Sequence, residues 1–147
     1  MLYRSSHSVF DCRYHIVWTV KYRKRLLKNQ HEREECESLL RRIGSEYGME
    51  IYAVEVDEDH VHMYVQVPPQ RSVGRAVGIF KSLSGRMMFK RFPYFKRKLW
   101  AGELWGDGYF VKTVGEAVTG RMVRKYLEQH EAKARGPVQA ELFPSKK

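Results

Sequence analysis

The stretch Met49–Val67, MEIYAVEVDEDHVHMYVQV, indicates the fold more strongly than any other part of the chain. Two runs rich in β-branched and aromatic residues flank the acidic turn Asp57–Asp59, which predicts two strands, Met49–Val56 and His60–Val67, joined as a hairpin. Side chains alternate between the two faces of a strand. The second strand therefore places valines and a methionine on the core face, and it places His60, His62, Tyr64 and Gln66 on the other.

The segments around this hairpin complete an alternating pattern. Asp11–Val20 also alternates, which predicts a strand, and residues 31–47 have apolar positions at helical spacing that end at Gly48. A second helix is expected at Val73–Phe92, a short strand at Tyr109–Val114, and a last helix at about Glu116–Ala134. The order β-α-β-β-α-β-α predicts an α+β, ferredoxin-like antiparallel sheet with helices on one face plus a C-terminal helix.

Length and composition favour one folded domain with an anionic partner. The 147 residues predict a single domain over 1–135 and a mobile tail over 136–147. The net charge is +10, and no Asp or Glu occurs between His60 and Gly102, which favours phosphate binding over a merely solvated surface. Two cysteines without CxxC spacing and the lack of a long apolar run or signal core predict a cytoplasmic protein.

His60 and His62 are candidate metal ligands. Residues i and i+2 of a strand project to the same side, so both imidazoles are expected to approach one cation. The alternative interpretation is two partly exposed sheet histidines without a ligand.

The last predicted helix carries the second candidate group. Tyr126 and His130 are four residues apart on one helix face, with Gln129 adjacent, and basic residues flank the tyrosine. A tyrosine in a basic setting is suited to meet a phosphate. The alternative is that Tyr126 simply packs on the sheet beside Val123 and Leu127.

Five ordered motifs resemble one family. They are Tyr14–Trp18 (YHIVW), Lys21–Arg23 (KYR), Asp59–His62 (DHVH), Leu104–Phe110 (LWGDGYF), and Tyr126 followed by Gln129 and His130. Together they resemble the single-tyrosine HUH transposases of small bacterial and archaeal insertion sequences, including their REP-associated relatives, over about Ser8–Ala134.

The resemblance implies a metal-dependent DNA transposase. Such enzymes cleave and rejoin single-stranded DNA at hairpin-marked element ends through a 5′-phosphotyrosine, use Mg²⁺ or Mn²⁺, and act as homodimers whose active sites can be shared between subunits. The nucleophile would be Tyr126, and two metal ligands would be His60 and His62. The family's third ligand is usually a Gln one turn after the tyrosine. Here that position holds His130, with Gln129 as the alternative, and a three-histidine site would favour Mn²⁺.

DNA contacts are expected from the basic segments, and two other functions are open. The predicted contacts are Lys21, Arg23, Lys24, Arg25, Arg75, Lys81, Arg86 and Lys90. Unpaired bases are expected to stack on Tyr22, Tyr94, Phe95, Trp100 and Trp105, unless these aromatics are packed inside. The alternatives are a non-catalytic single-stranded nucleic-acid-binding protein and a domesticated nuclease that processes hairpins of its host chromosome.

Overall fold

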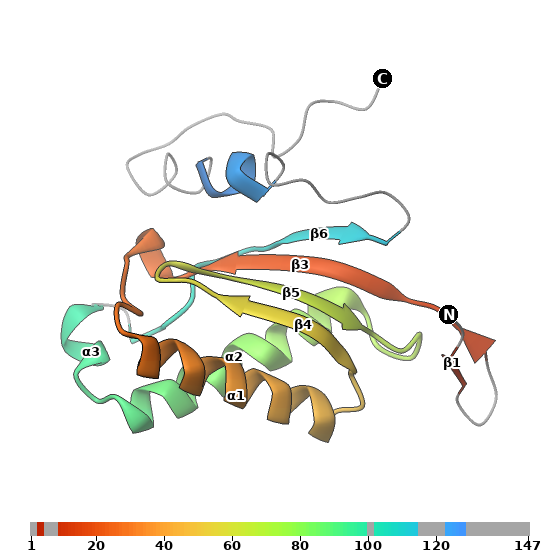
Figure 1. Ribbon diagram of the computed structural model, residues 1–147, viewed down its shortest axis with the longest axis horizontal. Helices are drawn as coiled ribbons and strands as arrows, with labels where there is room; N and C mark the ends of the chain where they lie inside the picture. Colours follow the sequence, from red (N-terminus) through yellow and green to blue (C-terminus); the bar gives the residue numbers. More distant parts are fainter. Residues whose placement is uncertain (1–2, 5–8, 100–101, 115–122, 129–147) are drawn as a thin grey trace.

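The computed structural model describes residues 3–4, 9–99, 102–114 and 123–128. A four-stranded sheet is formed by β3 (Arg13–Thr19), β4 (Ile51–Val56), β5 (His60–Gln66) and β6 (Phe110–Thr113). The strand order is β4-β5-β3-β6 with every pair antiparallel. Figure 1 shows these strands as one layer. The order confirms the predicted ferredoxin-like sheet.

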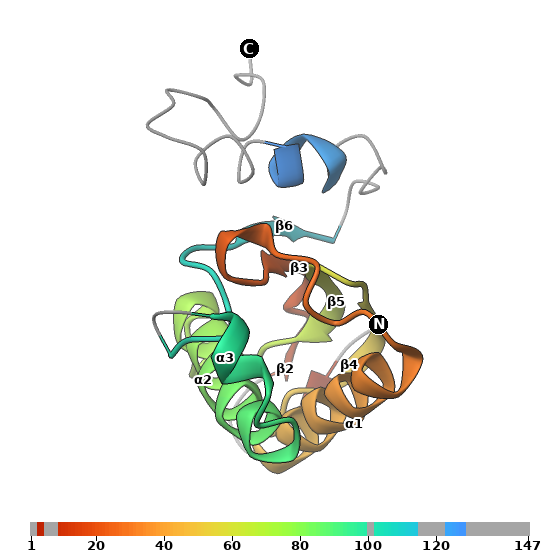
Figure 2. The ribbon, with the colours of Figure 1, turned by 90° about the vertical axis from the view of Figure 1, so that its left-hand side faces the viewer.

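Two long helices cover one face of this sheet, as Figures 1 and 2 show. They are α1 (Gln30–Glu46) and α2 (Val73–Arg91), and the short α3 (Phe95–Lys98) follows α2. Asn29 and Glu32 begin α1 with a reciprocal capping box, in which each side chain accepts a hydrogen bond from the other residue's backbone N–H. The predicted helix boundaries differ from the observed ones by only a residue at each end.

The main core lies between the sheet and these helices. Alternate residues of β3 and β5 face inward, with Ile16, Trp18, Val61, Met63 and Val65 fully buried there. The alternation predicted for both strands is confirmed. Their other residues point to the opposite face, which we call the outer face.

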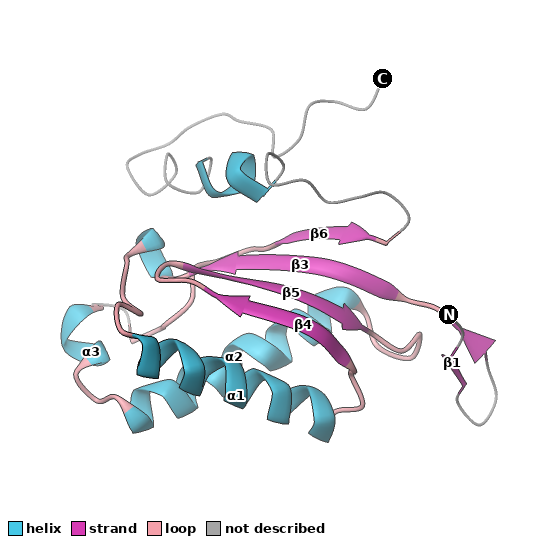
Figure 3. Cartoon of the chain, viewed as in Figure 1, coloured by secondary structure: helices cyan, strands magenta, loops and turns pink. Residues whose placement is uncertain are grey.

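A short helical segment, residues 123–128, lies over the outer face (Figure 3). It packs on the sheet through a second, smaller cluster of Val17, Phe110, Tyr126 and Leu127, with Val123 beside it. The rest of the helix predicted over residues 116–134 and the tail over 136–147 fall outside the described residues.

Some features were not predicted. Strands β1 (Tyr3–Arg4) and β2 (Val9–Phe10) form a separate antiparallel pair, and a 3₁₀ turn, η1 (Lys21–Arg23), follows β3. Phe95 and Trp105 are buried in the main core, so the expectation that they stack on DNA bases is wrong for this structure. None of the described helices is long and apolar enough to cross a membrane.

Candidate active site

The two candidate metal ligands project from β5 onto the outer face. His60 pairs with Thr19 across the ladder, and His62 pairs with Val17 on one side and Glu55 on the other. Val17 in turn pairs with Phe110 of β6. One row of the sheet therefore brings a carboxylate, an imidazole and two apolar side chains next to one another.

His60 is held by the residue before it. Its Nδ1 lies 2.8 Å from Oδ1 of Asp59. A carboxylate only accepts hydrogen bonds, so Nδ1 carries the hydrogen, and in the neutral ring the lone pair sits on Nε2. This carboxylate–histidine pairing is the usual way in which a protein orients a metal-binding imidazole.

Asp59 is charged in this setting. Burial alone would raise its pKa, but the hydrogen bond and charge of His60, together with the nearby Arg23, more than offset this and lower the pKa. Nε of Arg23 donates to Oδ2 of Asp59 at 3.1 Å. This supporting role of Asp59 was not predicted, although its place directly before the two histidines was a signal for it.

His62 contacts a third histidine. Its Nε2 lies 3.2 Å from Nδ1 of His15, whose ring stacks on Tyr64 at 4.9 Å between centroids. Burial lowers the pKa of both His62 and His15, and for His62 the neighbouring His15 adds to that effect. Neutral imidazoles are the form that binds metal, so the lowered pKa favours the protonation state in which His62 could act as a ligand.

Tyr126 is buried against the outer face. Its ring lies 5.8 Å from that of Phe110, between centroids, in the cluster that includes Val17. Burial raises the pKa of the phenol well above its ordinary value. The packing beside Val123 and Leu127 considered from the sequence is thus observed, in a cluster that also contains Val17, the ladder partner of His62. Gln129 and His130 lie outside the described residues.

The donor set suits a borderline divalent cation. Histidine nitrogens favour transition metals over Mg²⁺, with Mn²⁺ the weakest binder of that series, and the carboxylate behind His60 supplies the usual supporting contact. Within the described ranges, no group of three His, Cys, Asp or Glu side chains converges on one point.

The basic residues predicted to contact DNA separate into different environments. Lys21 pairs with Glu103 at 3.1 Å, and Arg23 points inward. Lys24 and Arg25 are exposed and line a cavity of about 360 Å³ together with Leu26, Lys28, Arg97 and Lys98. Arg97 and Lys98 were not among the predicted contacts, because only the fold brings α3 beside residues 24–28.

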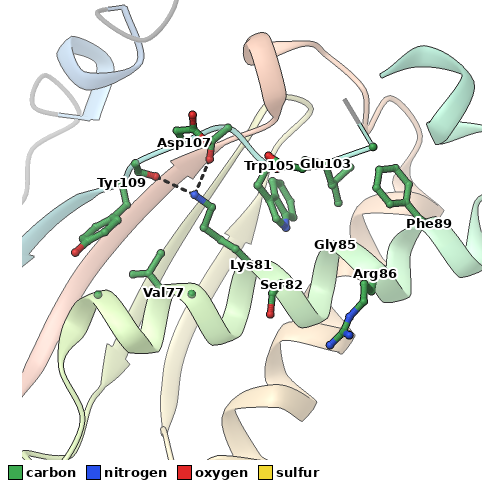
Figure 4. Close-up of a pocket in the computed structure, with 16 residues that line it drawn as sticks. Val77, Lys81, Ser82, Gly85, Arg86, Phe89, Glu103, Trp105, Asp107 and Tyr109 are labelled. Atoms are coloured by element: carbon green, nitrogen blue, oxygen red, sulfur yellow. Dashed lines mark hydrogen bonds between the residues drawn. The ribbon is translucent and has the colours of Figure 1, made fainter. Parts of the chain in front are cut away.

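The helix α2 lies on the other side of the sheet from Tyr126 (Figure 1). Arg75, Arg86 and Lys90 are exposed on it. Lys81 is instead half-buried, and its Nζ donates to the carbonyls of Gly106 and Gly108 at 2.6 and 3.1 Å, as Figure 4 shows. Burial lowers the pKa of Lys81. Because its observed hydrogen-bond partners are loop carbonyls, Lys81 links α2 to the loop after residue 102.

That loop and α2 enclose a groove of about 460 Å³. Figure 4 shows Trp105 over Gly85 of α2, whereas the side chain of Arg86 points away from the loop. Nε1 of Trp105 donates to the hydroxyl of Ser84 at 2.9 Å. Trp105 therefore joins the loop to α2.

Comparisons with known proteins agree on one family. A family model for IS200-like transposases matches residues 8–130. The ISDra2 transposase TnpA of Deinococcus radiodurans is 37% identical over 124 residues, which cover 84% of this chain and 87% of that protein. The IS200 transposase of Salmonella typhimurium is 34% identical over 111 residues, or 76% of this chain and 72% of that one.

A solved structure agrees with the sequence comparisons. A Deinococcus radiodurans protein provisionally named as a transposase, solved at 1.90 Å, superposes with a TM-score of 0.73 at 28% identity, over 92% of this chain and 99% of that one. Similarity in sequence and in fold thus spans most of the chain, and the range matched by the family model contains His60, His62 and Tyr126. The chain belongs to the family of IS200-like transposases.

Proposed function

We propose that this transposase cleaves and rejoins single-stranded DNA at hairpin-marked element ends through a 5′-phosphotyrosine at Tyr126. The observation that carries the proposal is the packing of the phenol ring beside Phe110, in the same buried cluster as Val17. Phe110 pairs with Val17 in the sheet ladder, and Val17 pairs with His62. The proposed nucleophile and the two histidines therefore share the outer face. Family membership supports the transfer of DNA strands, and it leaves the single-strand chemistry to be tested.

The proposed reaction is an exchange of phosphoesters. The Tyr126 oxygen attacks the phosphorus and forms the new P–O bond, the bond to the 3′ oxygen breaks, and the departing oxygen takes up a proton as a 3′-OH. The phenol proton leaves to solvent or a base. Because the covalent link keeps the energy of the phosphoester bond, a second 3′-OH can reverse the step at a new junction without ATP.

His60 and His62 are the residues that would hold Mg²⁺ or Mn²⁺, with His130 or Gln129 as third ligand. A cation bound there supplies charge that polarises a non-bridging phosphate oxygen and orients the phosphorus. Asp59 contributes by fixing the His60 ring with Nε2 available. A histidine as third ligand makes the site softer, and we expect Mn²⁺ to support activity better than Mg²⁺.

Tyr126 must leave its buried position to react. Its phenol has no solvent exposure in the observed arrangement. The step therefore requires the 123–128 segment to shift on the outer face, either on the same subunit or toward the partner in the homodimer that we propose. Hairpin DNA is the proposed partner that brings the scissile phosphate to this face.

The test uses hairpin DNA from the flanking sequence of this chain's own gene. Labelled single-stranded DNA is incubated with the protein and Mn²⁺ or Mg²⁺, and a denaturing protein gel detects covalent adducts. We expect an adduct for the unmodified protein and none for Tyr126→Phe or His60→Ala. DNA binding without an adduct, unchanged in both variants, would support a non-catalytic binding protein instead.

A further inference from the structure

Arg23 bridges two parts of the candidate site that lie far apart in the sequence. Its Nε donates to Oδ2 of Asp59 at 3.1 Å, and its Nη1 donates to the backbone carbonyl of Leu127 at 2.9 Å. Leu127 directly follows Tyr126. One guanidinium therefore joins the turn before β5 to the segment that carries the proposed nucleophile.

The bridge continues to a proposed metal ligand. Oδ1 of the same Asp59 carboxylate holds Nδ1 of His60 at 2.8 Å. A continuous set of hydrogen bonds thus runs from the Leu127 carbonyl through Arg23 and Asp59 to the His60 ring. Supporting contacts of this type fix the direction in which a metal-binding imidazole points.

The backbone around Arg23 is strained in the way that holds this side chain inward. Tyr22 and Arg23 have φ values of 59° and 53°, in the left-handed region that non-glycine residues rarely adopt. Such conformations persist only where the surroundings enforce them, and they concentrate at functional sites. Within the turn, Arg23 N donates to Val20 O at 2.7 Å. On its two sides, bonds from Val20 N to Asp59 O at 2.8 Å and from Leu27 N to Glu58 O at 3.0 Å tie the segment to the turn before β5.

We propose that Arg23 is a positioning residue for strand cleavage, which sets the Tyr126 segment relative to His60, and not a contact to DNA phosphate. The proposal rests on the proposed function of Tyr126 and His60. The proposal gives Arg23 a different role from its neighbours Lys24 and Arg25, which are exposed and line the cavity between residues 24–28 and α3. The two roles predict different measurable defects.

The test compares Arg23→Gln with three other variants of the full chain. Arg23→Lys keeps the charge but lacks the planar fork that donates in two directions. Arg25→Gln represents loss of a phosphate contact, and Arg41→Gln removes an α1 arginine whose observed partner is Glu37. Circular dichroism melting checks that each variant is folded. The measured quantities are the adduct rate at saturating DNA and the salt dependence of DNA affinity without metal.

We expect Arg23→Gln to reduce the adduct rate at saturating DNA by about 10- to 100-fold, the usual effect of losing a supporting contact of this kind. Arg23→Lys should be intermediate. The slope of log affinity against log salt should stay unchanged in Arg23→Gln, whereas Arg25→Gln should reduce it by about 0.7, the value for one contact to a single strand. Arg41→Gln should match the unmodified protein in rate and slope.

A metal-free measurement tests the bridge itself. Hydrogen exchange of the peptide containing residues 123–128 should accelerate in Arg23→Gln and not in Arg41→Gln, because the bond to the Leu127 carbonyl is lost. The double variant Arg23→Gln/Asp59→Asn should be no slower in cleavage than the worse single variant. The proposal is overturned if Arg23→Gln lowers the salt slope at an unchanged saturating rate, or if exchange of the segment does not change. Lack of an adduct in the unmodified protein would instead count against the proposed function.

Discussion

At the scale of single residues, the burial of Tyr126 is the feature that most affects its chemistry. The phenol sits among Val17, Phe110 and Leu127 with no exposed surface, and burial raises its pKa. Because an apolar site favours the neutral phenol over the phenolate, deprotonation of Tyr126 is linked to its exposure to solvent. We infer that the phenol of Tyr126, the proposed nucleophile, is kept protonated until the 123–128 segment moves.

This linkage predicts a specific alkaline behaviour. The folded-state pKa of Tyr126 is higher than the unfolded value of about 10, so its contribution to stability is complete below pH 10 and is lost as the pH rises through the folded-state pKa. A spectrophotometric titration at alkaline pH, taken as the unmodified protein minus Tyr126→Phe, should show one tyrosine ionising above pH 10. A difference curve with its midpoint at 10 or below would mean that the ring is not buried in solution.

The single residues also show what the sequence could and could not reveal. The strand period alone predicts that histidines at positions i and i+2 share one face of the sheet. The structure confirms this shared face for His60 and His62. Arg23 gave no such signal, because its partners at Asp59 and Leu127 are 36 and 104 positions away. In a run of basic residues it was indistinguishable from its exposed neighbours, and only tertiary contacts separate them.

At the scale of elements, α1 packs on the sheet at a distance that one glycine sets. A Cβ built on Gly44 would lie 2.6 Å from the backbone carbonyl of Met49 and 2.9 Å from Cδ1 of Ile51. The helix and the start of β4 are thus in direct backbone contact. Helical periodicity in the sequence predicted α1 correctly, but no periodic pattern reports how closely two elements approach.

This contact predicts opposite effects for two glycine substitutions. Gly44→Ala should lower the free energy of unfolding by about 1–3 kcal/mol, because overpacking against backbone outweighs the better helix propensity. Gly78→Ala, in α2 with no atom within 4 Å of the added Cβ, should instead raise it by up to about 1 kcal/mol. Urea denaturation of both variants provides the measurement. Equal effects in the two variants would refute the close packing of α1 on β4.

The burial of the loop after residue 102 was hard to predict, because its sequence is rich in aromatic residues and glycine. Trp105, next to the turn glycines at 106 and 108, resembled a surface side chain that could stack on bases. Its burial comes from α2, where Ser84 accepts its N–H and Lys81 holds the carbonyls of the same loop. Aromatic residues in loops have no period that distinguishes packing from exposure, so the sequence left both alternatives open.

At the scale of the whole molecule, the exposed basic residues predicted to contact DNA lie in two regions of the described chain. One region lines the cavity between residues 24–28 and α3, and it joins the turn before β5 through the main-chain bond of Leu27 to Glu58. The other is the exposed side of α2, across the sheet from Tyr126. Because the first region adjoins the His60 end of the outer face, we expect it to guide the scissile single strand.

Paired charge removals distinguish the two regions. Lys28→Gln/Arg97→Gln should weaken binding of an unstructured single-stranded oligonucleotide in metal-free buffer and reduce the salt slope by about 1.4, or about 0.7 per lost phosphate contact. Arg75→Gln/Lys90→Gln removes the same charge from α2, so any long-range effect of net charge is matched between the pairs. We expect this second pair to change the slope by less than half as much. Fluorescence anisotropy at several salt concentrations gives both slopes. If the α2 pair shows the larger reduction, the single strand runs along the helical face, and the path to Tyr126 must pass around the edge of the sheet.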